Sequence, residues 1–210
     1  TILYKIAGAS EPATYSFATG TGTIGASGAI LAFSGVNTTT PFDVATPSIR
    51  ETTSSTVTAT GITTVNTNVA IVYLGQAVGS TGGTSVSWTN ANWRTSSSPG
   101  TLTELYDNQE TTNRVSVAAA WGTRATIGST GNGTASLSTS VRNGGTLIAL
   151  RPIDVFAPVV SAQSPAANAT GVSISSTITA DFNEPMTAAT ISASTATLQA
   201  GTTLIPAAVT

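Results

Sequence analysis

The run Gly28-Ala29-Ile30-Leu31-Ala32-Phe33-Ser34-Gly35-Val36 is the stretch on which the fold prediction turns. Five consecutive apolar residues between glycines are too few for a stable helix, so they predict a β-strand buried on both faces. The residues after it, Asn37-Thr38-Thr39-Thr40-Pro41, predict a turn, because proline fixes its own φ angle and keeps the preceding residue extended. We expect the neighbouring short strands to lie beside this central one.

Other short apolar or alternating runs, each bounded by turn residues, recur along the chain. A second buried strand is expected at residues 68–75. Further strands are expected at 1–7, 13–19, 56–59, 84–88, 101–107, 114–121, 134–141, 145–152, 159–164, 195–200 and 203–209, with alternation through Ile174, Ile178 and Phe182 between them. This pattern has no helical period of useful length. It predicts an all-β protein built on an antiparallel, jelly-roll-like β-sandwich.

The composition indicates a folded protein with an almost uncharged surface. Of the 210 residues, 40% are hydrophobic, which is enough to bury a core, and only 8% are charged. Thr and Ser make up roughly a third of the chain, and such hydroxyl-rich surfaces suit an extracellular setting and the close packing of many copies. The absence of cysteine excludes disulfides and thiolate metal sites. It does not indicate a cytosolic location, because many bacterial surface proteins also lack cysteine.

Charge and hydropathy also limit the partners. Lys5 is the only lysine, the six arginines are scattered, and the net charge is −2, so a nucleic-acid partner is not expected. No apolar run approaches the ~20 residues of a membrane-spanning helix, so no membrane span is expected. Thr1 is interpreted as a processing product, a cloning boundary or an arbitrary start.

One run of expected strands ends near Pro152 and another begins after it. We therefore place a domain boundary near residue 155, between domains at 1–154 and 155–210. Beyond it stand Pro158-Val159-Val160, Ser164-Pro165-Ala166, Gly171-Val172 and Phe182-Asn183-Glu184-Pro185-Met186. This pattern resembles the opening of a bacterial immunoglobulin-like (Ig-like) domain of S-layer and other exported surface proteins. The resemblance covers residues 157–210, and the later strands of such a domain are missing. It therefore implies a partial Ig-like β-sandwich, incomplete at its C-terminal side.

Residues 1–152 carry a looser resemblance, through the stretch 4–13, the stretch 32–36 and Leu147-Ile148-Ala149-Leu150-Arg151-Pro152. These stretches are similar to a β-rich module that recurs in large exported bacterial proteins. Members of that group usually have more strands before the position of Tyr4. The resemblance implies secretion and a modular surface architecture, and it implies no catalytic residues.

Catalytic motifs are scarce. Without histidine or cysteine, serine triads, thiol catalysis and most zinc sites are excluded. The match to G-x-G-x-x-G at residues 20–25 leads into the expected strand rather than a helix, so it predicts a turn and not a dinucleotide site. A glycosidase-type carboxylate pair among Glu104, Asp107, Glu110, Glu51 and Asp43 remains formally open. In a regular strand, however, Glu104 and Asp107 point to opposite faces, and solvated surface charges are the simpler interpretation.

Two kinds of binding site are considered. Calcium is the only cofactor with candidate ligands, namely Asp107 and Glu110 in one cluster and Asp181 and Glu184 in another, but neither cluster has EF-hand spacing. Turn formation by Asx residues explains both clusters equally well.

The aromatic residues suggest a sugar-stacking platform or a packed core, and we favour the core. Trp93, in a polar loop, is the aromatic expected to be exposed. The aromatic residues concerned are Trp88, Trp93, Trp121, Tyr73 and Tyr106.

We therefore predict a non-enzymatic extracellular structural protein of the bacterial cell surface. Its copies would join head to tail, as the repeating subunit of a fibre or layer, by strand addition at residues 1–8 and 201–210. The alternatives are a glycan-binding, adhesive module that uses Trp93, or a phage virion decoration domain. A fragment of a longer protein is an equally open interpretation of the two unfinished sandwiches.

Overall fold

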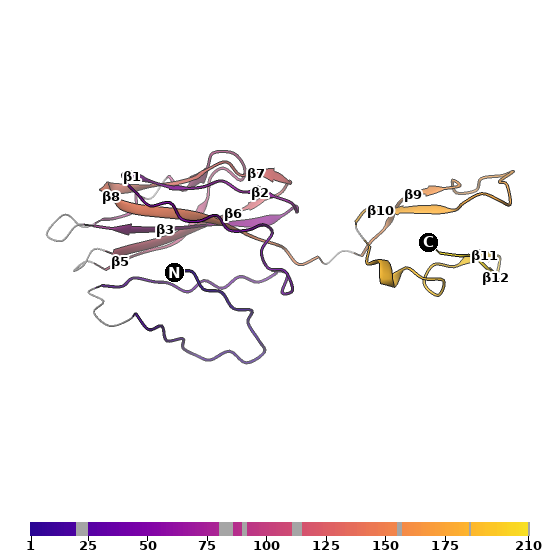
Figure 1. Cartoon of the computed structure of the whole chain (residues 1–210), viewed down its shortest axis with the longest axis horizontal. Coiled ribbons are helices and arrows are strands. Elements are labelled where there is room, and N and C mark those ends of the chain that lie inside the picture. Colours follow the sequence, from indigo (N-terminus) through magenta and orange to yellow (C-terminus); the bar gives the residue numbers. More distant parts are fainter. Residues whose placement is uncertain are drawn as a thin grey trace. The chain divides into compact units, whose positions relative to one another are not determined.

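The computed structural model describes residues 1–19, 25–79, 86–89, 92–110, 115–154, 157–184 and 186–209. The chain forms two compact units, Thr1–Asp154 and Val155–Thr210. Within the described ranges every regular element is a β-strand except one 3-10 turn, Ala188–Thr190 (Figure 1). The prediction of an all-β, antiparallel fold is confirmed.

A six-stranded sheet forms the body of the first unit, with the order β1-β8-β3-β6-β5 and β4 paired to β8. The central strand β3 runs antiparallel to both β6 and β8. A separate two-stranded pairing joins β2 and β7. The strands of this unit are β1 (Thr52–Ala59), β2 (Thr63–Thr64), β3 (Val69–Val78), β4 (Arg94–Thr95), β5 (Thr103–Glu110), β6 (Val115–Arg124), β7 (Gly128–Ser129) and β8 (Gly133–Leu150).

Strand β8 replaces two of the expected strands, at 134–141 and 145–152, with a single one of 18 residues. The expected interruption at 142–144 is absent, and Gly144 and Gly145 both stay in the ladder with β3. Strand β1 lies opposite both parts of β8, with Val57 facing Ala135 and Thr52 facing Asn143, whereas β3 lies opposite the last part, with Tyr73 facing Leu147. The strand is therefore continuous, with β1 along much of its length and β3 added along its last part.

The core of this unit is organised around Tyr73, whose side chain is fully buried. Its hydroxyl donates a hydrogen bond of 3.0 Å to the carbonyl oxygen of Val57, and burial raises the pKa of that hydroxyl. A Cβ atom on Gly133 would lie 2.9 Å from Cδ2 of Tyr73, and one on Gly145 would lie 2.8 Å from its Oη. Both glycines thus leave the space that the tyrosine fills.

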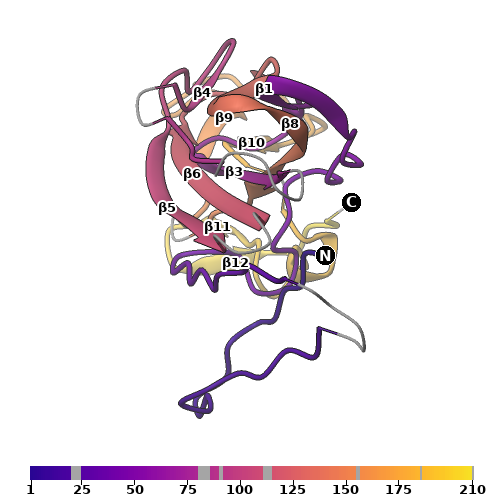
Figure 2. The ribbon, with the colours of Figure 1, turned by 90° about the vertical axis from the view of Figure 1, so that its left-hand side faces the viewer.

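The expected central strand at 28–36 is not formed. Ile30 is 63% exposed, and the segment makes a single bridge to the sheet, between Val36 and Pro152. The expectation is wrong because β3 already occupies the centre of the sheet and has a neighbour on each side. The described residues of the other two N-terminal strands expected, at 1–7 and 13–19, also form no strand, and Figure 2 shows this part of the chain looping away from the sheet.

The second unit contains two small antiparallel pairings. Strand β9 (Val160–Ser164) pairs with β10 (Thr179–Phe182), and β11 (Leu198–Ala200) pairs with β12 (Thr203–Ile205). Each of its side chains that the structure describes is exposed or only partly covered. Apolar side chains are among the exposed ones: Val159, Val160, Val172, Ile174, Ile178, Phe182, Leu198, Leu204 and Ile205. The described part of this unit therefore has no buried core of its own.

Replacing Gly133 by valine tests the packing around Tyr73. The added atoms would overlap Tyr73 and Leu147, so we expect a loss of about 2–3 kcal/mol in the free energy of unfolding. All three tryptophans lie in the first unit, so urea unfolding followed by tryptophan fluorescence reports on this unit alone. Gly28→Ala is the control, because nothing lies within 4 Å of its added Cβ, and it should change stability by less than about 0.5 kcal/mol. Equal effects of the two variants would contradict the packing argument.

Candidate functional site

The segment that follows the expected central strand is tied to the end of β8. The backbone N–H of Asn37 donates to the carbonyl of Arg151, and the N–H of Arg151 donates to the carbonyl of Pro41, each at 2.9 Å. Further along, the N–H of Asp43 donates to Ala149 at 2.9 Å. The predicted turn is present here, because Oδ1 of Asn37 accepts hydrogen bonds from the N–H groups of the second and third residues after it. This ladder fixes the position of residues 35–43.

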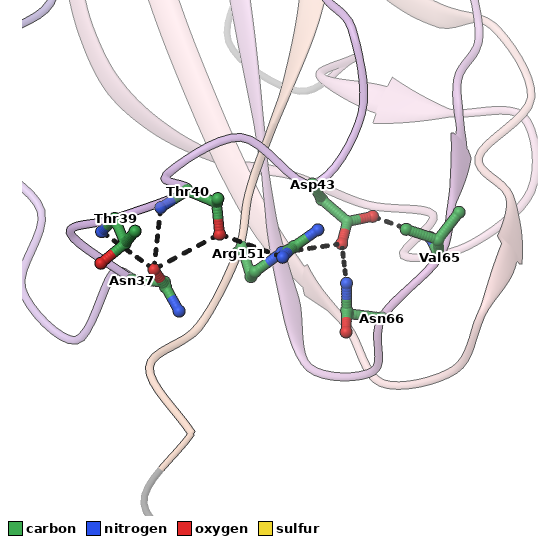
Figure 3. Close-up of polar contacts among 7 residues, drawn as sticks. All are labelled: Asn37, Thr39, Thr40, Asp43, Val65, Asn66 and Arg151. Carbon is green, nitrogen blue, oxygen red and sulfur yellow. Dashed lines mark hydrogen bonds and ion pairs between the residues drawn. The ribbon is translucent and has the colours of Figure 1, made fainter. Parts of the chain in front are cut away.

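A buried carboxylate lies at this corner of the molecule, where Asp43 is 5% exposed (Figure 3). Its Oδ2 accepts a hydrogen bond of 2.8 Å from the backbone N–H of Val65, and its Oδ1 accepts one of 2.6 Å from the side-chain amide of Asn66. Nε of Arg151 lies 3.9 Å from Oδ1, and its Nη1 donates to the hydroxyl of Thr40 at 3.0 Å. Asp43 therefore joins three segments that are distant in sequence, and its oxygens are engaged in structural contacts.

Next to this corner is a hollow of about 420 Å³ between residues 32–36 and the outer face of the sheet. The indole of Trp121, on β6, forms part of its wall and is 36% exposed. The hollow is lined by Ala32, Phe33, Ser34, Gly35, Val36, Asn68, Ala70, Leu105, Trp121, Thr123, Leu150, Arg151 and Pro152. This is the concave surface on which the structure combines an open aromatic ring with polar side chains.

The expectation that Trp93 is the exposed aromatic is wrong, because this residue is only 5% exposed. Its ring stacks on Trp88 at a centroid distance of 5.2 Å, and its Nε1 donates a hydrogen bond of 2.9 Å to Glu104. The ring also meets Tyr73 edge-on, so it packs within the core. The sequence did hold a signal for the exposed tryptophan: with Ala118 and Ala120 facing the core, strand alternation turns Trp121 outward.

The five candidate catalytic carboxylates lie on separate parts of the chain: Asp43 and Glu51 precede β1, and Glu104, Asp107 and Glu110 lie on β5. Glu104 is held by Trp93, and Glu51 forms an exposed ion pair with Arg142. A bulge after Glu104 shifts the register of β5, so that Glu104 lies opposite Ala120 and Asp107 opposite Ala118. The two acidic residues therefore share a face of the sheet, contrary to the expectation for a regular strand. The contacts seen for Asp43, Glu51 and Glu104 are structural.

The structure places the calcium candidates on two separate strands. Asp107 and Glu110 lie in β5, whereas Asp181 lies in β10 and Glu184 just after it. Searching the described residues reveals no group of three or more acidic, histidine or cysteine side chains that is able to hold a metal ion. Calcium binding at either cluster stays a prediction. The glycine motif at 20–25 lies almost entirely outside the described residues.

Residues 1–19, here called the N-terminal arm, are organised by Glu11. Its Oε2 accepts a hydrogen bond of 2.6 Å from Lys5 and another from the hydroxyl of Tyr15, and its Oε1 accepts one of 2.5 Å from the N–H of Gly8. The bond from Lys5, followed by those from Tyr15 and Gly8, lowers the pKa of Glu11 to about 2. Tyr4 packs edge-on against Phe42 at 4.7 Å between ring centroids. Several apolar side chains of the arm remain exposed, namely Ile2, Leu3, Tyr4, Ile6, Tyr15 and Phe17.

Comparison with known proteins finds one family to which the second unit is similar. Residues 154–210 match a protein family described as "Bacterial Ig-like domain", which confirms the resemblance drawn from the sequence. Domains of this family are typical of bacterial surface and exported proteins and have a non-catalytic fold. No curated protein and no solved structure matches the chain. Among the described residues we also find no helix with the length and hydropathy required to span a membrane.

Truncating Asp43 tests whether the corner depends on its carboxylate. Asp43→Ala leaves the N–H of Val65 and the amide of Asn66 without their acceptor and the guanidinium of Arg151 without its ion-pair partner, so the free energy of unfolding should fall by about 2–4 kcal/mol. The control is Glu51→Ala, which removes an exposed ion pair and should cost less than about 1 kcal/mol. Denaturant unfolding measures both, and a loss at Asp43 no larger than at Glu51 would contradict the assignment.

The pKa of Glu11 tests the organisation of the N-terminal arm. Because it lies below the ordinary value of 4.5, the contacts of Glu11 should stabilise the turn fully above pH 4.5 and be lost as the pH falls through about 2. Carboxyl-detected NMR should show Glu11 titrating near pH 2 in the native chain and closer to 4.5 in Lys5→Ala. Titration of native Glu11 near 4.5 would show that these contacts do not form in solution.

Proposed function

We propose that this chain is a non-enzymatic structural part of an exported bacterial surface protein, and that its copies join by strand addition. The observation that carries the proposal is the pattern of exposed apolar side chains. They lie on the N-terminal arm and throughout the described part of the Ig-like unit, whereas the first unit closes a core around Tyr73. Apolar surface of this extent usually marks an interaction site.

The N-terminal arm has the character of a donor segment. Residues 1–7 alternate bulky side chains, and Ile2, Tyr4 and Ile6 share one side of an extended chain. The backbone of this stretch takes part in no strand pairing of the structure. An extended apolar segment of this kind can supply main-chain hydrogen bonds and alternate side chains to an open sheet edge.

The Ig-like unit has the character of an acceptor. Its two pairings leave strand edges open. Among its apolar side chains, Val160 is 50% exposed and Phe182 is 37% exposed. Residues 155–210 contain Asp181 and Glu184 but no lysine or arginine, whereas residues 1–8 contain Lys5 and no acidic residue. Within the N-terminal arm, however, Lys5 is already paired with Glu11, so apolar side chains and not charge would supply the contact. Contact between an arm and the Ig-like unit of another copy is head to tail and, if it does not close into a ring, builds a filament.

Removing the apolar side chains of the arm tests this proposal. Sedimentation velocity over a series of concentrations should show the full chain forming species larger than a monomer. The triple variant Ile2→Thr, Tyr4→Thr, Ile6→Thr should shift that assembly to at least about tenfold higher concentration, because most interface energy resides in a few buried side chains. Val65→Thr with Ile127→Thr is the matched control, since both residues are exposed elsewhere in the first unit.

Two results would contradict the proposal. One is a full chain that stays monomeric at high concentration, with only single particles in negative-stain images. The other is assembly that the arm variant and the control variant weaken equally, which would show that general surface hydrophobicity and not the arm drives association.

A further inference from the structure

We propose that the hollow around Trp121 is a binding site for a neutral, hydroxyl-rich ligand of the saccharide class. This inference concerns the first unit alone and does not depend on strand addition between copies.

The first argument is the exposure of one indole ring. Trp88 and Trp93 are 4% and 5% exposed and bond Ser116 and Glu104 through their Nε1 atoms, whereas Trp121 is 36% exposed. Two other apolar side chains of the hollow, Phe33 and Leu105, are each 37% exposed. The largest aromatic side chain is thus left open in a concave surface that other apolar groups extend. Such a surface provides a stacking face for a ligand.

The second argument is that the hollow is held in place before any ligand arrives. The segment that forms one wall is fixed to the end of β8 where the N–H of Ile153 donates to Gly35 at 2.8 Å and that of Asn37 donates to Arg151 at 2.9 Å. Gly35 has a φ angle of +72°, which lets the chain turn there. The volume of about 420 Å³ falls within the range of about 300–1,000 Å³ found for small-molecule sites.

Polar residues also stand among those that line the hollow: Asn68, Thr123 and Ser34 carry an amide and two hydroxyls. Asn68 has a φ angle of +55°, in the left-handed region that asparagine adopts more often than most other non-glycine residues, and its N–H donates to the carbonyl of Ala125. This turn places Asn68 directly before β3, at the hollow.

Charge narrows the chemistry of the ligand further. Arg151 is the single charged residue among those that line the hollow; its Nη1 donates to Thr40, and its Nε lies 3.9 Å from the buried carboxylate of Asp43. A phosphate or carboxylate ligand would therefore compete with Asp43 for this cation, and a purely apolar ligand would leave the amide and hydroxyls without partners. A neutral saccharide fits both constraints, because its C–H face packs on an indole while its hydroxyls bond Asn, Thr and Ser side chains.

The test begins with a glycan array of neutral and acidic glycans, probed with the fluorescently labelled full chain. We expect binding to neutral glycans. The strongest neutral glycan is then titrated while tryptophan emission is followed. Because Trp121 is the exposed tryptophan of the three, the titration should shift its emission and protect it from acrylamide quenching.

Three variants make the result specific. Trp121→Ala should weaken binding at least about tenfold. Asn68→Gly should also weaken binding, yet keep or raise stability, because glycine adopts a positive φ angle without strain. Val117→Ala, on the same face of β6 but outside the hollow, should bind as the native chain does.

Several outcomes would overturn the proposal. These are the absence of saturable binding to any neutral glycan, binding to acidic glycans alone, and binding that survives unchanged in both Trp121→Ala and Asn68→Gly. Urea unfolding of Trp121→Ala followed by the emission of Trp88 and Trp93 shows whether that variant is folded, and Asn68→Gly tests the same hollow without loss of an aromatic side chain.

Discussion

The packing of Tyr73 against two glycines of β8 is the constraint on which the first unit depends. Gly133 and Gly145 leave the room that the ring and hydroxyl of Tyr73 occupy, and the hydroxyl reaches the backbone of β1 at Val57. The ring also meets Trp93 edge-on, at 5.4 Å between centroids. One side chain of the central strand thus connects β1, β8 and the loop that carries Trp93. The other strands pack around this contact.

The packing of the core also determines which side chains lie on the surface of the first unit. Once β3 lies between β6 and β8 with Tyr73 inward, alternation along β6 points Trp121 outward. The end of β8 then meets the segment 35–43, and the carboxylate of Asp43 links that segment to Asn66 and Arg151. The hollow beside Trp121 therefore lies between the outer face of the sheet and residues 32–36, which hydrogen bonds tie to the end of β8.

Local patterns in the sequence predicted several features well. The run at 68–75 became β3, because β-branched and apolar residues buried on both faces have few alternatives to a central strand. The turn at 37–41 followed from Asn and Pro, whose preferences are local. The pattern from Pro158 to Met186 was sufficient to indicate the Ig-like family, because its prolines and glycine stand at fixed spacings along the chain.

The features that the sequence could not predict depend on competition between distant segments. The run at 28–36 is as apolar as β3, but only one of them can take the central position, and no local rule decides which. Trp93 follows a polar stretch and is nevertheless buried, because its ring packs against Trp88 and Tyr73. The register shift in β5 comes from a bulge, which the amino-acid pattern does not mark.

The two units differ in how much apolar surface each buries within itself. The first encloses a core, whereas the described part of the second unit exposes its apolar side chains. Amide hydrogen exchange measured residue by residue on the dilute, unassembled chain tests this contrast directly. The account predicts strong protection in β3, β6 and β8 and little in β9 to β12, with protection of the latter rising on assembly. Equally strong protection of β9 to β12 in the unassembled chain would contradict it.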